Sequence, residues 1–434
     1  MRKLGRIWFS VSMLVLTATI TSTPALVAPV HASSEADAVR GRMVEVLNEV
    51  SGLVKDNYYD PSLKGLDWKG AVEIARDRIR HADHEGEMAA AISGLLARLA
   101  DSHTYFLRPG RLQPVIFGFL AKAFGNEVRV YQIMQRGPAE AAGLQLGDRI
   151  VGIEDFAVNR TLIDDEIRYF TYLDPRLTLK LTIERNGGLP QEIVLKGKQP
   201  VTSSKEFVKE YGEYEKEQRK EATREGVVPY DDGRLVYVRL PTFMVAQGEA
   251  DSFLRKAKDS QALILDLRDD GGGREEILKE MAGHFLPELT QIAEGISRGK
   301  REEVFAKPKN PNLVMPMFVL VDSGSASASE ILARVLQLKH RAVIMGDQTA
   351  GKVNRARLFG GMGGAIWRIP YAVAITVSRA AMPDGEELEG HGVLPDVTCV
   401  PSEENLRAGQ DRCLAEALML ARKAISKAAV PGTH

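Results

Sequence analysis

The sequence predicts a multidomain α+β protein, with an N-terminal helical segment and a β-rich domain inserted before an α/β core. Apolar residues follow helical spacing in residues 36–100 and alternate as in strands within residues 113–200. After Gly233 they form near-continuous runs separated by helical stretches. The chain has 434 residues, of which 44% are hydrophobic and 26% charged, enough for two or three domains. The net charge of -1 indicates no nucleic-acid partner.

The first 32 residues predict a secretory signal peptide. Arg2, Lys3 and Arg6 precede an apolar run at 7–20, and Val-His-Ala at 30–32 resembles a small-residue cleavage site. The run is short and rich in Ser and Thr, which argues against a membrane anchor. Cleavage would remove three positive charges and no acid, leaving a net charge of -4. We therefore expect a periplasmic or secreted protein with no stable membrane span.

Residues 33–110 are predicted to be a helical domain. Met43–Val54 and Met88–Ala100 have apolar residues at helical spacing, and the turn-forming segment 57–62 separates them. Residues 111–200 are predicted to be β-rich, with one short helix at Pro138–Leu144. Its clearest strands are at 128–134, 148–154 and 177–187.

A charged helical linker is expected at residues 201–232, followed by the α/β core at 233–400 and a C-terminal helix at 401–434. The apolar runs at 234–240, 262–267, 317–322 and 342–346 are typical of strands buried on both faces. The glycine-rich stretch 359–364 is expected to be a turn or loop between strands. The chain has two cysteines, Cys399 and Cys413, and a disulfide between them would hold the C-terminal helix to the preceding strand.

The segment 321–332, VDSGSASASEIL, lies where a buried strand passes into a helix. Such a turn exposes a serine side chain, and the next N–H is a free donor at the helix N-terminus. That donor can bind an oxyanion, so one serine of this turn is a candidate nucleophile. The alternative is a capping box, with Ser327 as N-cap and Glu330 at the third helical position.

Two further loops follow buried strands. Gly271–Gly273 would let backbone N–H groups approach a substrate carbonyl, although a plain turn also fits. No Gly-Lys-Ser/Thr follows, which disfavours a phosphate loop. The loop 346–352 places Lys352 25 residues after Ser327. A lysine can serve as a general base if burial lowers its pKa, and the alternative is a surface lysine.

These segments, in this order, resemble the carboxyl-terminal processing peptidases, also called tail-specific proteases. The matching stretches are SHTYFL at 102–107, FGFL at 117–120, RGPAEAAGLQLGDRIVGIED at 136–155, LILDLRDDGGG at 263–273, SGSASASEIL at 323–332, GDQTAGK at 346–352 and EGHGVLPDV at 389–397. The resemblance implies a PDZ domain at 111–200 and a crotonase-like or Clp-protease-like core. It also implies a serine endopeptidase that needs no cofactor or metal.

By the same resemblance, Ser327 is the nucleophile and Lys352 the base of a Ser–Lys dyad. The backbone N–H groups of Gly272 and Ala328 would form the oxyanion hole. Members of the family often carry a glutamine four residues after the lysine, where this chain has Ala356. Asn354 is the candidate to replace it.

An alternative base comes from His103 and Glu389, which resemble the arrangement of the tricorn protease. The competing interpretation of His103 is a structural residue that holds the helical domain to the core. The resemblance also implies a carboxylate-binding loop in the PDZ domain, at Phe117, Gly118, Phe119 and Leu120, whose N–H groups would hold a substrate C-terminus.

The expected partners are therefore proteins or peptides with accessible C-termini. An adaptor protein and a homo-oligomer remain open. The competing function, from another class, is a catalytically silent PDZ-containing binding or scaffold protein that keeps the fold.

Overall fold

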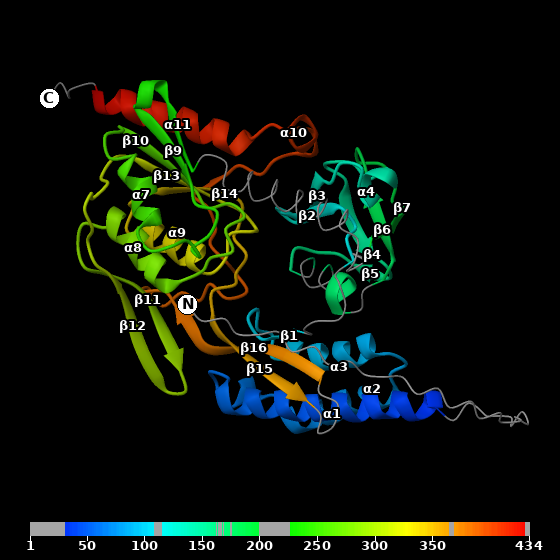
Figure 1. Cartoon of the computed structure of the whole chain (residues 1–434). Coiled ribbons are helices and arrows are strands. Elements are labelled where there is room, and N and C mark those ends of the chain that lie inside the picture. Colours follow the sequence, from blue (N-terminus) through cyan, green and yellow to red (C-terminus); the bar gives the residue numbers. More distant parts are fainter. Residues whose placement is uncertain are drawn as a thin grey trace, which may run out of the picture.

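The computed structural model describes residues 31–107, 115–198, 226–363 and 369–429, apart from 162, 164–166, 168 and 174–175. Figure 1 shows a helical unit, a β-rich unit and an α/β core that carries the C-terminal helix. Residues 1–30 of the predicted signal peptide and 201–225 of the predicted linker lie outside the described residues. Within the described ranges, no helix combines the length and apolar character needed to span a bilayer.

The N-terminal unit consists of α1 (His31–Asn57), η1 (Leu63–Gly65), α2 (Trp68–His81) and α3 (Glu85–Ala97). Both helical patterns in the sequence are confirmed here. The buried stripe of α1 packs against α2, α3 and a sheet beneath them. That sheet contributes Phe106 from β1 (Tyr105–Leu107) and Tyr371, Val373 and Ile375 from β16 (Ile369–Ala381) to the same core. The helical unit is therefore completed by a strand more than 260 residues away from β1 in the chain.

The strands of this sheet are β1, β16, β11 (Thr290–Ser297) and β12 (Lys300–Ala306), with β15 (Arg355–Gly363) on the other side of β16. The glycine stretch 359–363 is part of β15, so the expected turn there is wrong. It pairs in register with residues 369–373. A Cβ at Gly361 would lie 2.4 Å from the Tyr371 hydroxyl oxygen, so the glycine makes room for this large side chain.

The β-rich unit is an antiparallel sheet with the order β2-β3-β4-β6-β7, and β5 pairs with β4. The predicted strands and the short helix are confirmed. Its elements are β2 (Phe119–Phe124), β3 (Glu127–Ile133), α4 (Pro138–Ala141), β4 (Arg149–Ile153), β5 (Phe156–Ala157), η2 (Tyr169–Leu173), β6 (Thr178–Glu184) and β7 (Gln191–Lys196).

The α/β core has a sheet with the order β17-β14-β13-β10-β9-β8, parallel except for β8. The four apolar runs predicted as strands form β9, β10, β13 and β14. The elements are β8 (Val227–Tyr230), η3 (Asp231–Gly233), β9 (Leu235–Arg239), α7 (Glu249–Arg255), β10 (Ala262–Asp266), α8 (Glu275–Phe285), β13 (Met317–Val321), α9 (Ala328–Leu338), β14 (Val343–Gly346), β17 (Val397–Thr398), α10 (Glu403–Ala408) and α11 (Arg412–Ala429).

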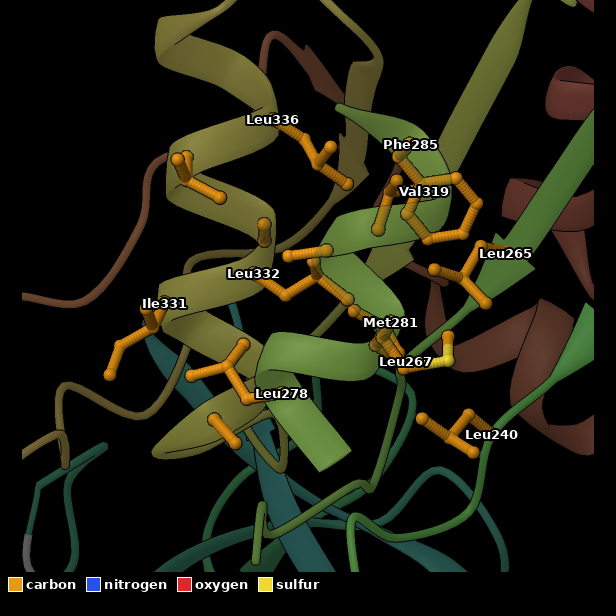
Figure 2. Packing of buried hydrophobic residues seen from close by; sticks show 14 of the residues in the cluster. Leu240, Leu265, Leu267, Leu278, Met281, Phe285, Val319, Ile331, Leu332 and Leu336 are labelled. Atoms are coloured by element: carbon orange, nitrogen blue, oxygen red, sulfur yellow. The ribbon is translucent and has the colours of Figure 1, made fainter. Parts of the chain in front are cut away.

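Both faces of this sheet are covered. Figure 2 shows Leu332 and Leu336 of α9 packed with Phe285 of α8 over Val319 of β13. Helix α11 covers the opposite face with its own apolar side chains. Because β10, β13 and β14 are adjacent and parallel, their carboxyl ends meet at one edge of the sheet. The three loops singled out in the sequence leave the sheet at that edge.

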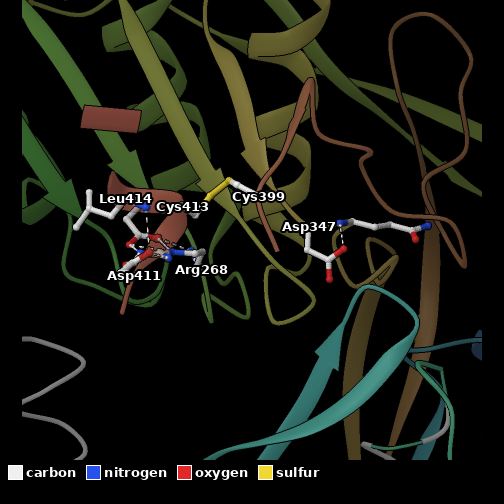
Figure 3. Close-up of a disulfide and its surroundings, with 8 residues drawn as sticks. Arg268, Asp347, Cys399, Asp411, Cys413 and Leu414 are labelled. Carbon is white, nitrogen blue, oxygen red and sulfur yellow. Dashed lines mark hydrogen bonds and ion pairs between the residues drawn. A yellow bond between two sulfur atoms is a disulfide. The ribbon is translucent and has the colours of Figure 1, made fainter. Parts of the chain in front are cut away.

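The Sγ atoms of Cys399 and Cys413 are bonded, with Cα atoms 5.1 Å apart. Cys413 lies in the first turn of α11, so the bond holds this helix to the end of β17. Figure 3 shows Arg268 and Asp411 beside the disulfide. The guanidinium of Arg268 donates to both oxygens of Asp411, at 2.9 and 2.7 Å. The start of α11 is therefore also tied to the loop that follows β10.

Candidate active site

Ser327 is the N-cap of α9 and has an unusual backbone conformation, φ 58° and ψ -116°. A positive φ at a residue with a Cβ costs about 1–3 kcal/mol, which the surroundings must offset. The Ser327 N–H donates to the Lys352 carbonyl oxygen at 2.8 Å and to Glu330 Oε2 at 3.0 Å. The strained turn is therefore held by the loop that carries Lys352 and by the first turn of α9.

The other serines of the segment are used to fix its backbone. The hydroxyl of Ser325 donates to the Leu267 carbonyl oxygen at 2.7 Å, and that of Ser329 to the Asp270 carbonyl oxygen at 2.9 Å. The Ser323 hydroxyl donates to the carbonyl oxygen of Ala123 in β2, at 2.7 Å. Two of these bonds join the serine turn (residues 322–329) to the loop after β10, and the third joins it to β2. Ser327 is left as the serine with a special backbone conformation.

Glu330 links the serine turn to the loop 346–352, called the lysine loop below. Its Oε1 accepts from the Thr349 hydroxyl at 2.5 Å and the Gly351 N–H at 2.7 Å, and its Oε2 accepts from the N–H groups of Ser327 and Lys352. The residue is fully buried. Burial raises the pKa of Glu330 above its usual value, although these hydrogen bonds oppose the shift. The capping-box position predicted this residue, but its contacts with residues 349–352 are not local in sequence.

The glycine turn, Gly271–Gly273, is packed directly against the serine turn. A Cβ at Gly272 would lie 2.6 Å from the Ser327 Cβ and 2.9 Å from the Ala328 nitrogen, so no side chain fits there. However, the Gly272 N–H donates to Asp270 Oδ1 at 2.8 Å. This bond engages the N–H that the resemblance assigned to the oxyanion hole.

Gly273 is a second candidate in this turn for the backbone donor of the oxyanion hole. It forms a parallel bridge with Phe243, which uses the Gly272 carbonyl oxygen and the Arg274 N–H. That pattern leaves the Gly273 N–H outside the bridge. Gly273 also lines the same cavity as Ser327 and Ala328. As the first residue of α9, Ala328 has an N–H with no acceptor within the helix.

Two neighbouring cavities meet at this site. One of about 470 Å³ is lined by Ser327, and the other, of about 1060 Å³, is lined by Lys352. Asn354 and Arg379 line both. The backbones of Ser327 and Lys352 are hydrogen-bonded, and the larger cavity lies between the lysine loop and the segment that precedes β1.

His103 and Glu389 lie on the Lys352 side of the site. Ser102 donates its N–H to Glu389 Oε1 at 3.0 Å, and its hydroxyl lies 2.7 Å from His103 Nδ1. Glu389 Oε2 also accepts from the Val353 N–H at 3.0 Å. Burial lowers the pKa of His103; the carboxylates of Glu389 and Asp101 oppose this, and the charge of Lys352 adds to it. The structure thus brings His103, Glu389 and Lys352 into one electrostatic neighbourhood.

Ala356, where family members often carry a glutamine, and Asn354, the candidate to replace it, lie beside the lysine loop. Ala356 is in β15 opposite Thr376, and Asn354 is 3% exposed. Asn354 Oδ1 accepts from the Ala380 N–H at 3.1 Å, which fixes the amide against β16.

The loop 117–120 lies at the start of β2, at one end of the β-rich sheet. Phe117 is buried in the core of this unit, and Gly118 has φ +77°. A Cβ at Gly118 would lie 3.0 Å from Pro138 Cδ. Leu120 is 37% exposed. Phe119 and Leu120 pair with residues 133 and 132 of β3.

Lys122, further along β2, was not singled out in the sequence. Its Nζ lies 2.5 Å from Asp269 Oδ1 and 2.6 Å from Asp322 Oδ2, and its side chain is 13% exposed. Burial alone would lower the pKa of Lys122, but the carboxylates of Asp322 and Asp269 raise it above the ordinary value. A lysine within the apolar strand FLAKAF was the available signal. Through Asp269 and Asp322, Lys122 bridges the loop that carries the glycine turn and the start of the serine turn.

A second contact reaches the lysine loop. Arg160 Nη1 donates to Asp347 Oδ2 at 3.0 Å and to the Gly125 carbonyl oxygen at 2.6 Å, and its Nη2 donates to the Gln348 carbonyl oxygen. The Gly125 N–H also donates to Asp347 Oδ2, at 2.8 Å. The β-rich unit therefore contacts all three loops of the site.

Comparison with known families gives two matches. The profile of peptidase family S41 matches residues 234–399, and that of the Tricorn protease C1 domain matches residues 44–97. The first range contains the serine turn, the glycine turn and the lysine loop.

Similar proteins agree with these matches. A carboxyl-terminal-processing protease of Synechocystis sp. is 28% identical over 365 residues, which cover 79% of this chain and 78% of that protein. The solved photosystem II D1 C-terminal processing protease superposes with a TM-score of 0.50 at 22% identity, covering 83% of this chain and 94% of that one. Mature CPAF, complexed with lactacystin, gives a TM-score of 0.66 at 13% identity, covering 90% and 99%. At these identities, the two structural matches show a shared fold.

Proposed function

Because this chain is a serine peptidase of family S41, we propose that it is an exported endopeptidase that processes or degrades proteins from their C-terminal region, with Ser327 as nucleophile. The observation that carries the proposal is the strained conformation of Ser327 at the start of α9, packed against the glycine turn. Export is supported by the expected signal peptide at residues 1–32, which would place the mature enzyme in the periplasm or outside the cell.

In the proposed reaction, Ser327 Oγ attacks the scissile carbonyl carbon and transfers its proton to the base. The carbonyl oxygen becomes an oxyanion that accepts from the N–H groups of Ala328 and Gly273. Collapse of this intermediate expels the amine with a proton from the base and leaves an acyl-enzyme. Water then hydrolyses the ester and regenerates Ser327.

We propose Lys352 as the base. Its backbone is tied to Ser327 and Glu330, and a cavity large enough for an extended peptide lies beside it. The alternative base is His103, oriented by Glu389. The lowered pKa of His103 favours a neutral imidazole, which can accept a proton. This alternative is supported by the match of residues 44–97, just before His103, to the Tricorn protease C1 domain.

The β-rich unit is proposed to be a PDZ domain that binds substrate C-termini and controls activity. Support for binding comes from the loop 117–120 at the end of the sheet, where strand addition needs an edge. Support for control comes from Lys122 and Arg160, which connect this unit to the catalytic loops.

The test of this function is cleavage of fluorescein-labelled casein and of a C-terminally extended peptide by the purified mature chain. We expect wild type to cut both and to cut the free-acid peptide with a KM at least about tenfold lower than its C-terminal amide, because the amide removes the charge that the loop would bind. Equal KM values for acid and amide would contradict the C-terminal recognition. No cleavage of either substrate would support the silent binding protein instead.

Replacing Lys122 by Met tests the coupling between the two units. The substitution leaves Asp269 and Asp322 without their cation, so we expect the free energy of unfolding to fall by about 3–5 kcal/mol. We also expect kcat to fall more than tenfold while peptide binding to the β-rich unit is kept. Lys180→Met is the matched control, because this lysine is in the same unit and pairs with Asp155 and Glu192 at the surface. It should change neither quantity appreciably. Unchanged kcat in Lys122→Met would rule out the coupling.

A further inference from the structure

Asp270 is a buried carboxyl group directly behind the proposed oxyanion hole. It is fully buried, and its Oδ1 accepts from the Gly272 N–H at 2.8 Å. Its other oxygen, Oδ2, is also buried and has no hydrogen-bond partner among the described residues. A charged carboxylate with one unsatisfied oxygen is far more costly in such a place than a neutral carboxyl group.

The backbone of Asp270 connects to the serine turn. Its carbonyl oxygen accepts from the Ala326 N–H and the Ser329 hydroxyl, both at 2.9 Å. These donors stand on either side of Ser327 and Ala328 in the chain. Through its side chain, Asp270 also holds Gly272, the residue before Gly273. One residue therefore connects the two backbone segments that carry the proposed donors.

We propose that Asp270 is a positioning residue that, as a neutral carboxyl group, locks the glycine turn to the serine turn and keeps the N–H groups of Gly273 and Ala328 in place. The inference rests on the proposed function of Ser327. In this role the neutral acid offers an acceptor to Gly272 without placing a negative charge beside the developing oxyanion. Ionisation of the carboxyl group would add that charge and oppose acylation.

The surroundings of Asp270 support a neutral state. Burial raises the pKa of Asp270 to about 8, and the hydrogen bond that its carboxyl group accepts from the Gly272 N–H offsets only part of that shift. The charged group that faces it is Arg239 at the end of β9, whose attraction also lowers the pKa. The neighbouring Asp269 is paired with Lys122. Ionisation of Asp270 therefore falls within the pH range in which the enzyme can be assayed.

The test compares kcat/KM for labelled casein between wild type and Asp270→Asn from about pH 6 to about pH 10. The Asn carbonyl oxygen can still accept from Gly272, so we expect the two enzymes to agree within about threefold below pH 7. Above the pKa of about 8, the ratio of Asp270→Asn to wild type should rise by up to about tenfold per pH unit. Titration of the general base cancels in this ratio. A ratio independent of pH would overturn the proposal.

Two further variants separate positioning from packing. Asp270→Ala removes the acceptor for Gly272, and we expect it to lose about 10²–10³ in kcat/KM at every pH. Full activity in this variant would also overturn the proposal. Asp266→Asn is the matched control: this carboxylate is equally buried, but Arg268 keeps its pKa below the usual value. Its ratio to wild type should therefore not change across this pH range.

An unfolding experiment reports on Asp270 even if casein is not cut. The folded carboxyl group holds a proton up to about pH 8, whereas the unfolded group loses it near 3.8. Folding therefore takes up a proton between these values, and stability falls as the pH rises through this window. We expect the urea midpoint of wild type to fall relative to Asp270→Asn from about pH 5 to about pH 8. If the midpoints stay parallel, Asp270 is ionised in the fold and the inference fails, whatever the activity.

Discussion

Ser327→Ala is expected to abolish proteolysis, with kcat falling on the order of 10⁶-fold, because no other group can form the acyl-enzyme. Lys352→Met is expected to cost about 10²–10⁴ in kcat/KM, the usual contribution of a general base. His103→Gln should stay within about tenfold of wild type. The measurement is the initial rate of labelled-casein cleavage at several pH values, with thermal unfolding of each variant to establish that it folds.

The opposite pattern of activities would identify His103, and not Lys352, as the general base. If Lys352→Met still cuts casein and His103→Gln does not, the base is His103 with Glu389. Glu389→Gln cannot separate the two mechanisms. The Glu389 carboxylate accepts from Ser102 and Val353, so its loss would disturb the lysine loop and the histidine segment alike. The comparison must therefore use the two candidate bases themselves.

Glu330→Gln is expected to lower kcat by about 10²–10³ and the free energy of unfolding by about 3 kcal/mol. The carboxylate accepts four hydrogen bonds, and an amide would turn one acceptor into a donor that faces other donors. Either orientation of the amide would release part of the contact between Ser327 and the lysine loop. Steady-state kinetics and urea unfolding measure the two effects.

The matched control is Glu280→Gln, a buried glutamate on α8 that accepts from the Gly248 N–H at 3.1 Å. This variant should lose stability but keep kcat within about threefold, since it contacts none of the three loops. If Glu330→Gln loses stability and keeps kcat, then Glu330 only caps α9. In that case, the hydrogen bond from the Ser327 N–H to the Lys352 carbonyl oxygen would be enough to align Ser327.

Lys122 and Asp270 contact neighbouring parts of the same two turns. Lys122 pairs with Asp269 and Asp322, at the strand ends, whereas Asp270 Oδ1 accepts from the Gly272 N–H. Variants at these positions are therefore close enough to couple, and their effects should not add.

The sequence by itself determined the secondary structure and the chemistry-bearing segments. The strands β9, β10, β13 and β14, the helix after Ser327 and the helices α1 and α3 all follow from apolar spacing, because a side chain's direction in a helix or strand depends on near neighbours. For the glycine stretch 359–363, the local pattern predicted a turn, and that prediction was wrong. Its strand conformation comes from pairing with β16, and the space it leaves is filled by Tyr371.

The tertiary structure alone decided which groups are available at the site. It occupied the Gly272 N–H with Asp270 and left Gly273 outside the bridge with Phe243. It joined residues 349–352 to Glu330 and set Lys122 between two aspartates of the core. The bond between Asp270 and Gly272 spans only two positions, but the other contacts join residues between 19 and 200 positions apart, so no local pattern encodes them. They depend on the order of β10, β13 and β14, which brings three loops to one edge of the sheet.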